Sequence, residues 1–468
     1  MYMSKVADFS PTKRFFVEML TRDIALEDAI LDLLDNCLDG VARAEAGNGD
    51  DVPYAGYRVD INFTAKEFEI VDNCGGIPVS AVDYAFRMGR PTSAPDEELA
   101  TVGVYGIGMK RSIFKIGKQC KIDTSHSEGS AFQVDIDEKW LSSDNDWKIP
   151  IQTKIATSTN FGTHISITEI NESVARRFKS KEFRTELINK IVFAYSYIIA
   201  KGFTVYVNGD RINPNPLNIR YESSAEFGKS ILPYIYKAEI DDVEVKLVVG
   251  FSAPLITEKE EEEAKREAKF RTEDAGWTIV CNDRIVVYKD KTELTGWGVE
   301  FPRYHTQFIA ISGIVYFKSR FPSKLPITTT KRGVDANSSI FLKVRKHIVE
   351  GTKIFIDYTN KWKGDELIKE SNARLLKANS ASPLELIERI SNAHLTEFTK
   401  VKNRSNEVKL KPDLPVPSSK ITDVKKMSFT KNIDDIELVA DFLQMSDGET
   451  PSQIAEKCFD YVLLEAEK

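Results

Sequence analysis

The clearest pattern along the chain is helical and lies near the N-terminus. Between Ile24 and Ala46, apolar residues recur at intervals of three and four until the sequence GNGDD interrupts them. This spacing places the apolar side chains on one face and predicts an amphipathic helix. The same kind of spacing predicts helices over 81–88, after Gly108 and over 339–363.

Strict alternation of apolar and polar residues predicts strands between these helices. Residues 59–63 and 68–70 alternate and are separated by a short connection, which predicts a hairpin. Asn208-Gly209 predicts a two-residue hairpin turn within 203–212. Other predicted strands are 132–137, 162–170, the two arms of a hairpin across Asn282-Asp283, and 308–317. The mixture predicts an α+β chain, with a second α+β domain over roughly 180–350.

Two segments carry many charges. Residues 258–271 combine acidic and basic side chains at helical spacing, which predicts a solvated helix. Residues 400–431 contain nine Lys or Arg against three acidic residues and include the sequence PDLPVPSS. We interpret this second segment as a flexible basic linker, with a nucleic-acid contact as the alternative. A terminal helical region follows it, and Thr450 caps the start of its last helix.

Composition limits the class of protein. The 468 residues are enough for about two to four domains, and 42% apolar with 29% charged residues is typical of a globular chain. The net charge of −7 gives no overall positive field for nucleic acid or anionic lipid. The five cysteines are scattered, which fits a reducing cytosolic compartment. We find no signal pattern and no apolar run long enough to span a membrane, so we expect a cytoplasmic protein.

The first predicted helix has an unusual polar face. Asp28, Asp32, Asp35, Asn36 and Asp39 are three or four residues apart, so several carboxylates share one side. Like charges at this spacing repel, and a cationic group should offset that cost. The spacing of Asp32 and Asn36 suits a carboxylate that orients water beside an amide that ligates Mg²⁺. A solvated acidic face is the alternative interpretation.

Two glycine-containing segments follow this helix. Asp72 ends an apolar strand and is followed by Gly75 and Gly76, a pattern that suits either close approach of a ligand or an ordinary turn. Further along, glycines spaced G-x-x-G-x-G precede a helix that opens with two cations. Glycines at a helix N-terminus expose N–H groups that bind phosphate. This second set is Gly103, Gly106, Gly108, Lys110 and Arg111.

The order and spacing of these segments resemble the GHKL ATPase superfamily, which includes the B subunit of gyrase, MutL repair proteins, MORC proteins, histidine kinases and the ninety-kilodalton heat-shock chaperones. The resemblance covers about residues 20–170. It comprises D-x-x-x-N on an acidic helix, D-N-x-G-G after a strand, a polar lid-like segment, G-x-x-G-x-G before a helix, and a strand that opens with Gly162-Thr163. It implies a Bergerat-type α/β sandwich with ATP in a pocket beside a mixed sheet.

The resemblance assigns roles to individual residues. It implies that Asn36 ligates Mg²⁺, that Asp72 reads the adenine amino group, and that Thr163 supports this contact. Residues 88–101 match a lid that closes over the nucleotide. Glycines that match the turn after Asp72, the lid border and the phosphate site are Gly76, Gly103, Gly106 and Gly108.

Two departures from the family pattern concern Asp32 and Cys74. Asp32 stands where the gyrase, MutL and chaperone branches place a glutamate as the base that activates water. Its carboxylate is one methylene shorter, and a displacement of about 1 Å can cost on the order of 100-fold in rate, so we expect slow hydrolysis or help from Asp35. Cys74 replaces the first glycine of D-x-G-x-G but leaves Asp72 in register.

The second domain resembles the transducer domain of the MutL, MORC and gyrase branch, which has a ribosomal-protein-like α/β fold. The matching sequences are GWTIVCNDRIVVYKDKTELTGWG and LPITTTKRGVD. Lys331 matches the loop lysine that reaches the terminal phosphate of ATP. An exposed basic turn is the alternative interpretation of this loop.

Together these patterns predict a Mg²⁺-dependent ATPase that works as an ATP-driven switch or clamp, on nucleic acid in DNA repair or defence. The alternatives are a chaperone-like or signalling switch that acts on a protein, or a nucleotide-binding regulatory subunit with little turnover. By resemblance, the closed state is an ATP-dependent homodimer. The predicted parts are an ATP-binding domain (1–175), a transducer-like domain (176–365), a helical segment (366–398), the basic linker (399–432) and a C-terminal helical region (433–468).

Overall fold

The structure is a computed structural model of the chain, and it divides into two compact units, Met1–Val416 and Pro417–Lys468. The residues that it describes are 12–46, 53–89, 98–103, 106–143, 146–155, 161–222, 230–257, 260, 275–401, 406–417, 430–445 and 449–466. No helix within these ranges combines the length and the apolar character needed to cross a membrane.

The first sheet follows the predicted alternation. Among the described residues it has eight strands in the order β5-β4-β3-β6-β2-β1-β7-β8, antiparallel except for the parallel pair of β1 and β7. The strands are β1 (Arg58–Phe63), β2 (Phe68–Asp72), β3 (Gly117–Ser125), β4 (Ser130–Ile136), β5 (Ile151–Ile155), β6 (Gly162–Ile170), β7 (Thr204–Val207) and β8 (Asp210–Arg211). The predicted hairpin of β1 and β2 is confirmed, as is the Asn208-Gly209 turn, where both residues have positive φ.

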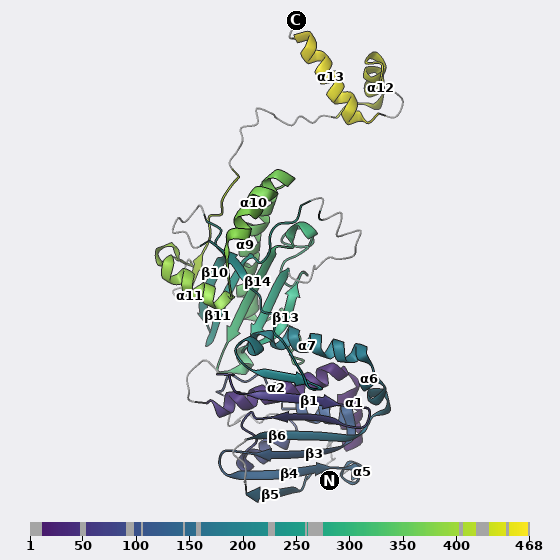
Figure 1. The fold of residues 1–468 in the computed structure, drawn as a ribbon, viewed down its shortest axis with the longest axis vertical. Helices are drawn as coiled ribbons and strands as arrows, with labels where there is room; N and C mark the ends of the chain where they lie inside the picture. The colour runs from purple at the N-terminus through teal and green to yellow at the C-terminus, as the bar shows by residue number, and fades with distance from the viewer. Residues whose placement is uncertain are drawn as a thin grey trace, which may run out of the picture. The chain divides into compact units, whose positions relative to one another are not determined.

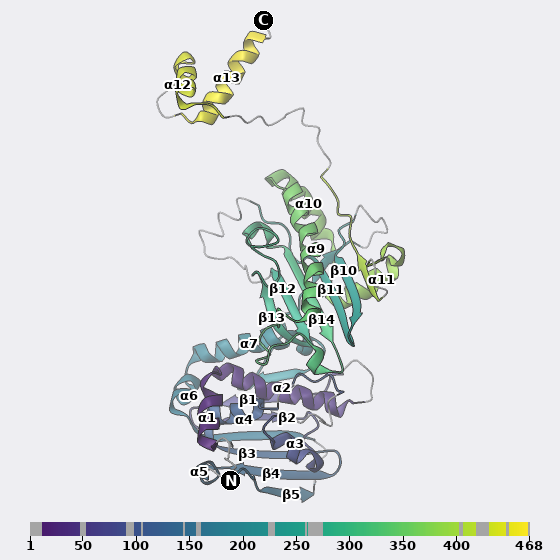
Figure 2. The same ribbon diagram turned by 180° about the vertical axis from the view of Figure 1, so that it is seen from behind.

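Helices cover one face of this sheet, and Figure 2 shows α1, α2 and α4 lying across it. The predicted N-terminal helix is confirmed as α2, whose apolar side chains Leu34 and Leu38 are buried with Ile61 and Ile70 of the sheet. The helices of this part are α1 (Lys13–Arg22), α2 (Leu26–Ala44), α3 (Val82–Phe86), α4 (Gly108–Ile116), α5 (Glu138–Ser142), α6 (Glu172–Phe178) and α7 (Lys181–Ala200).

The first core extends beyond residue 175, where we expected the first domain to end. The side chains of α7 and β7 belong to it, and it continues to Ile212. Helix α7 also contacts the second sheet, where Phe193 stacks on Tyr288 with ring centroids 4.5 Å apart. The apolar residues of α7 therefore pack against both sheets.

The second sheet has seven strands in the described residues, in the order β13-β12-β14-β11-β10-β17-β16. The hairpin across Asn282-Asp283 is confirmed, and both turn residues have positive φ. The strands are β10 (Tyr234–Ile240), β11 (Val243–Phe251), β12 (Gly276–Cys281), β13 (Arg284–Asp290), β14 (Ile311–Lys318), β16 (Thr399–Lys400) and β17 (Glu407–Leu410). A separate pair joins β9 (Ile219–Tyr221) and β15 (Asn379–Ala381).

The long helix predicted over 339–363 is present as α9 (Ser339–Lys361), which packs on the second sheet (Figure 1). It is followed by α10 (Asp365–Lys377) and α11 (Pro383–Ala393). The segment predicted as a solvated helix, 258–271, lies outside the described residues except for Glu260.

The prediction of a flexible linker over 399–432 requires a correction. Residues 407–410 form β17, which pairs antiparallel with β10 and buries Leu410 completely. The excess of lysines hid the short alternation of Val408 and Leu410 with charged residues. Part of the segment's positive charge is also neutralised, because the Lys409 ammonium lies 2.7 Å from the Glu350 carboxylate.

The second unit contains the predicted terminal helices, α12 (Ile433–Phe442) and α13 (Pro451–Ala466). The predicted cap at Thr450 is confirmed: the N–H of Gln453 donates to its hydroxyl at 3.4 Å, and Thr450 donates back to the Gln453 side chain. Of their large apolar side chains, Ile454 is buried.

Candidate functional site

A cavity of about 500 Å³ lies beside α2, where the first sheet meets the loop that follows β14. Its wall is built by α2, the segment after β2, Leu99, Gly103, residues 106–111, β6 and Lys331. All of the site residues predicted from the sequence line it. They are Asp32, Asn36, Asp72, Gly76, Gly103, Gly106, Gly108, Lys110, Thr163 and Lys331. The structure therefore brings together residues that are up to about 300 positions apart.

The acidic face of α2 is buried and balanced by cations. Asp32, Asp35 and Asp39 each have 5% exposure or less. Arg111 pairs with Asp32, and both Arg284 and Lys331 pair with Asp35. The interpretation of this stripe as a solvated acidic face is therefore wrong. Its carboxylates belong to an ionic network, as expected when like charges are buried together.

Asp32 is held at one oxygen. The Arg111 Nε and Nη2 atoms lie 2.8 and 2.5 Å from its Oδ2, and within the described residues Oδ1 has no hydrogen-bond partner. Burial raises the pKa of Asp32, as does the neighbouring Asp35 charge, against the opposing effects of Lys331 and Arg111. A carboxylate with a raised pKa and one open oxygen is suited to accept a proton.

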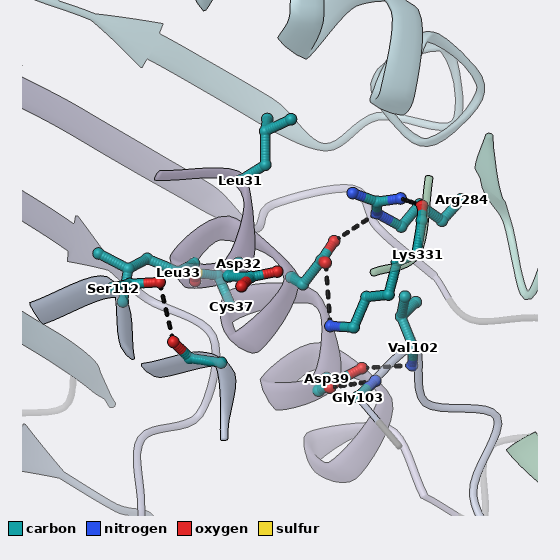
Figure 3. A network of polar contacts seen from close by, with 12 residues as sticks. Leu31, Asp32, Leu33, Cys37, Asp39, Val102, Gly103, Ser112, Arg284 and Lys331 are labelled. Atoms are coloured by element: carbon teal, nitrogen blue, oxygen red, sulfur yellow. Dashed lines mark hydrogen bonds and ion pairs between the residues drawn. The ribbon is translucent and has the colours of Figure 1, made fainter. Parts of the chain in front are cut away.

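In Asp35, by contrast, both carboxylate oxygens accept hydrogen bonds. Its Oδ1 accepts hydrogen bonds from Tyr195 Oη and Arg284 Nε, both at 2.6 Å, and its Oδ2 accepts one from Lys331 Nζ at 3.0 Å. Arg284 and Lys331, both labelled in Figure 3, therefore donate to opposite oxygens of this carboxylate. Burial alone would raise the pKa of Asp35, but Arg284 and Lys331 outweigh it and the pKa is lowered. Asp35 is therefore a poor candidate for the assisting base that the sequence allowed.

Asn36 carries an unsatisfied amide. Its Nδ2 atom is buried and has no hydrogen-bond partner in the described part of the chain. A half-turn of the amide would place the oxygen at this point, where it fits a hard cation. No cluster of three or more His, Cys, Asp or Glu side chains suited to a metal occurs among the described residues. One amide ligand fits Mg²⁺, which commonly keeps several waters and binds substrate phosphates.

Asp72 is oriented by the turn that follows it. Its Oδ1 accepts the backbone N–H groups of Cys74 at 2.8 Å and Thr163 at 3.2 Å, and its Oδ2 accepts the Cys37 thiol at 3.4 Å. Burial raises the pKa of Asp72, and the Cys74 N–H partly offsets this effect. With Oδ1 fixed, Oδ2 is the oxygen left to receive a further donor such as an exocyclic amine.

Two glycines permit close contacts at the edge of the cavity. Gly76 has φ of 70°, and a Cβ there would clash with the backbone oxygen of Ser125. A Cβ at Gly103 would clash with the Asp39 carboxylate, which accepts the N–H groups of Val102 and Gly103 (Figure 3). Asp39 thus fixes residues 102–103. These two residues directly follow the predicted lid (88–101), of which the structure describes 88–89 and 98–101.

The N-terminus of α4 opens onto the cavity. The side chain of its N-cap residue, Ile107, is apolar and makes no capping hydrogen bond. The first residue of the helix, Gly108, lies against Asp32. Uncapped N–H groups and the helix dipole attract phosphate. Lys110 adds a cation whose Nζ donates to the Gly106 carbonyl at 2.8 Å, and within the described residues it has no carboxylate partner.

The buried ammonium of Lys110 predicts a pH dependence. Burial lowers its pKa to about 8, so the group is charged below pH 8 and neutral above it. If the charge contacts a phosphate, the affinity for ATP falls by about tenfold from pH 7 to pH 9, as the protonated fraction falls. Titration calorimetry across this range measures the effect. Lys110→Gln should bind ATP weakly at both pH values, and a wild-type affinity that ignores pH would contradict the assignment.

Sequence reasoning missed several contributors to the site. Asp39 belonged to the recognised stripe, but its role as an anchor for the Val102 and Gly103 N–H groups depends on tertiary structure. Arg284 and Tyr195 follow ordinary strand and helix patterns, and their positions in the sequence contain no signal of a shared partner. Cys37 looked like a core residue on the apolar face of α2.

Most of the residues that line the cavity lie in a part of the chain that matches a known family. Residues 24–172 match the model of a family described as histidine kinase-, DNA gyrase B-, and HSP90-like ATPases. This match supports membership of the GHKL superfamily for the first domain, and it covers less than half of the chain. No curated protein matches the chain in a sequence comparison.

Proposed function

We propose that this chain is a slow Mg²⁺-dependent ATPase that works as an ATP-driven conformational switch of the MutL and MORC type. The observation that best supports the proposal is the position of Lys331. It comes from the second part of the chain, lies 296 residues after Asp35, and enters the cavity of the ATPase-type domain. A cation in this position can contact the terminal phosphate and couple its presence to the second sheet.

Each residue of the cavity has its own role in binding or hydrolysis. Asp72 receives the adenine amino group, and the N-terminus of α4 with Lys110 holds the phosphates. Asn36 would hold Mg²⁺, which would supply charge neutralisation at the phosphate oxygens. Asp32 takes the proton of the attacking water as the bond between the terminal phosphorus and its bridging oxygen breaks, which yields ADP and phosphate.

A switch also needs two conformations with different affinities for ATP. In this proposal the segment fixed by Asp39 and the loop of Lys331 change conformation together when ATP binds. The closed state is a homodimer. The second sheet then acts as a transducer domain.

The partner in this cycle is nucleic acid, and the basic segment 400–431 supports it. The overall charge of −7 and the pairing of Lys409 with Glu350 favour a protein client as the second candidate. The shorter carboxylate of Asp32 favours a third candidate, a regulatory subunit with little turnover.

Steady-state ATP hydrolysis by the full chain tests the proposal, with and without Mg²⁺ and double-stranded DNA at two salt concentrations. We expect phosphate release that requires Mg²⁺ and rises with DNA at low salt, since phosphate contacts weaken as salt increases. In the Asn36→Ala variant, more Mg²⁺ should be needed for the same rate. A rate that ignores DNA points to the protein client, whereas absent turnover with bound ATP supports the regulatory subunit. Absence of both turnover and ATP binding contradicts the proposal.

A further inference from the structure

The Asp35 carboxylate has more donors than its charge requires. It is completely buried, and it receives one phenol, one guanidinium and one ammonium. The two cations exceed its single negative charge. Lys331, with 8% exposure, is the one of these three donors that also lines the nucleotide cavity.

The backbone of Lys331 is held independently of its ammonium. Its N–H donates to the Thr328 carbonyl at 2.9 Å, its φ is 58°, and its own carbonyl accepts a hydrogen bond from Arg284. Arg284 therefore fixes both Asp35 and the main chain of Lys331. The ammonium at the end of the lysine side chain can change partner while this frame stays in place.

Removal of the ammonium from Asp35 leaves no orphaned charge. Arg284 Nε and Tyr195 Oη remain on Oδ1 at 2.6 Å, so the buried carboxylate keeps a cation and a hydroxyl donor. Loss of the single partner of a buried charge is costly, and a carboxylate with a second cation avoids most of that cost. This arrangement suits a lysine that is exchanged between two anions.

We propose that Asp35 is a positioning residue that competes with the terminal phosphate of ATP for the Lys331 ammonium. This inference rests on the proposed function. While the terminal phosphate is absent, Asp35 holds the lysine; a triphosphate draws the lysine away, and a diphosphate does not reach it. Asp35 thereby weakens ATP binding but not ADP binding, and it recovers Lys331 after hydrolysis.

The test is the ratio of the Kd values for Mg-ADP and Mg-ATP, measured by titration calorimetry on the full chain. Asp35→Asn removes the competing charge, and we expect the ratio to shift about tenfold toward ATP. Loss of a negative charge also favours ATP without any lysine. The control is therefore the same substitution in a Lys331→Met background, where the shift should be less than about threefold.

Tyr195→Phe provides a second variant in case Asp35→Asn does not fold. It removes one hydrogen bond from Asp35 and leaves every group of the nucleotide cavity intact. Asp35 then attracts Lys331 more strongly, so the ratio should shift toward ADP, opposite to Asp35→Asn, by about two- to fivefold.

The outcomes separate the two proposals. If the wild type binds neither nucleotide, the proposed function fails. If it binds both, and Asp35→Asn and Tyr195→Phe leave the ratio unchanged, the competition is refuted while the ATP site stands. Equal shifts with and without Lys331 would also refute it, because they would show a field effect of Asp35 rather than exchange of the lysine.

Discussion

Replacement of Asp32 by alanine should lower kcat for ATP hydrolysis by about 10²- to 10⁴-fold, with a much smaller change in the Kd for ATP. Asp32 lines the cavity next to the N-terminus of α4, and its pKa is raised by burial. It combines this property with an Oδ1 atom that has no hydrogen-bond partner in the described residues, whereas Asp35 is occupied at both oxygens. The rate of phosphate release and equilibrium ATP binding measure the two effects separately.

Two conservative variants sharpen this prediction. Asp32→Asn keeps the shape and the contact with Arg111 but cannot take a proton, so it should lose as much rate as the alanine variant. Asp32→Glu keeps a carboxylate at this position and extends it by one methylene. Near-wild-type turnover in both the alanine and asparagine variants would show that another group activates water.

Replacement of Arg284 by methionine should lower the free energy of unfolding by about 2–3 kcal/mol, because it removes a charged donor from the buried Asp35 carboxylate while Lys331 still pairs with that carboxylate. Arg284 has 2% exposure and touches Asp35, the Lys331 carbonyl and the face of the Tyr195 ring. Without it, Asp35 loses a cation that lowers its pKa, and the frame of the Lys331 loop loses a donor. Urea unfolding of the full chain measures the loss.

Lys190→Met is the matched control for Arg284→Met. Lys190 also pairs with α2, through Asp28 at 3.1 Å, but its side chain is 41% exposed. Solvent screens such a pair, so the variant should cost less than about 1 kcal/mol. Equal losses in the two variants would contradict the view that the buried network around Asp35 is the stronger link.

The sequence predicted elements whose signals are local. The spacing of apolar residues located α2, and the Asn208-Gly209 and Asn282-Asp283 turns were predicted because two-residue hairpins need positive φ. The short strand β17 was missed because lysines surround its two apolar residues. The sheet continues past residue 175 because β7 pairs with β1, a contact between distant segments.

The residues that line the candidate site were predicted from local motifs, but their hydrogen-bond and ion-pair partners were not. Its lining residues occur in ordered motifs, and all ten line one cavity. The partners of those residues come from distant elements with ordinary local patterns. Arg284 begins a strand and Tyr195 lies within a helix, so only the tertiary structure brings them to Asp35.

Equilibrium binding of Mg-ATP to the full chain, with the Asp72→Asn variant beside it, shows whether the cavity is an ATP site in which Asp72 receives the adenine. In the variant, the atom that accepts the Cys74 and Thr163 N–H groups remains an oxygen, and the amide NH₂ replaces Oδ2. A donor would then face the adenine amino group. We predict one ATP per chain for the wild type and at least tenfold weaker binding for the variant. Absence of ATP binding by the wild type would show that the cavity is not an ATP site, and equal affinity in the variant would show that Asp72 does not receive the adenine.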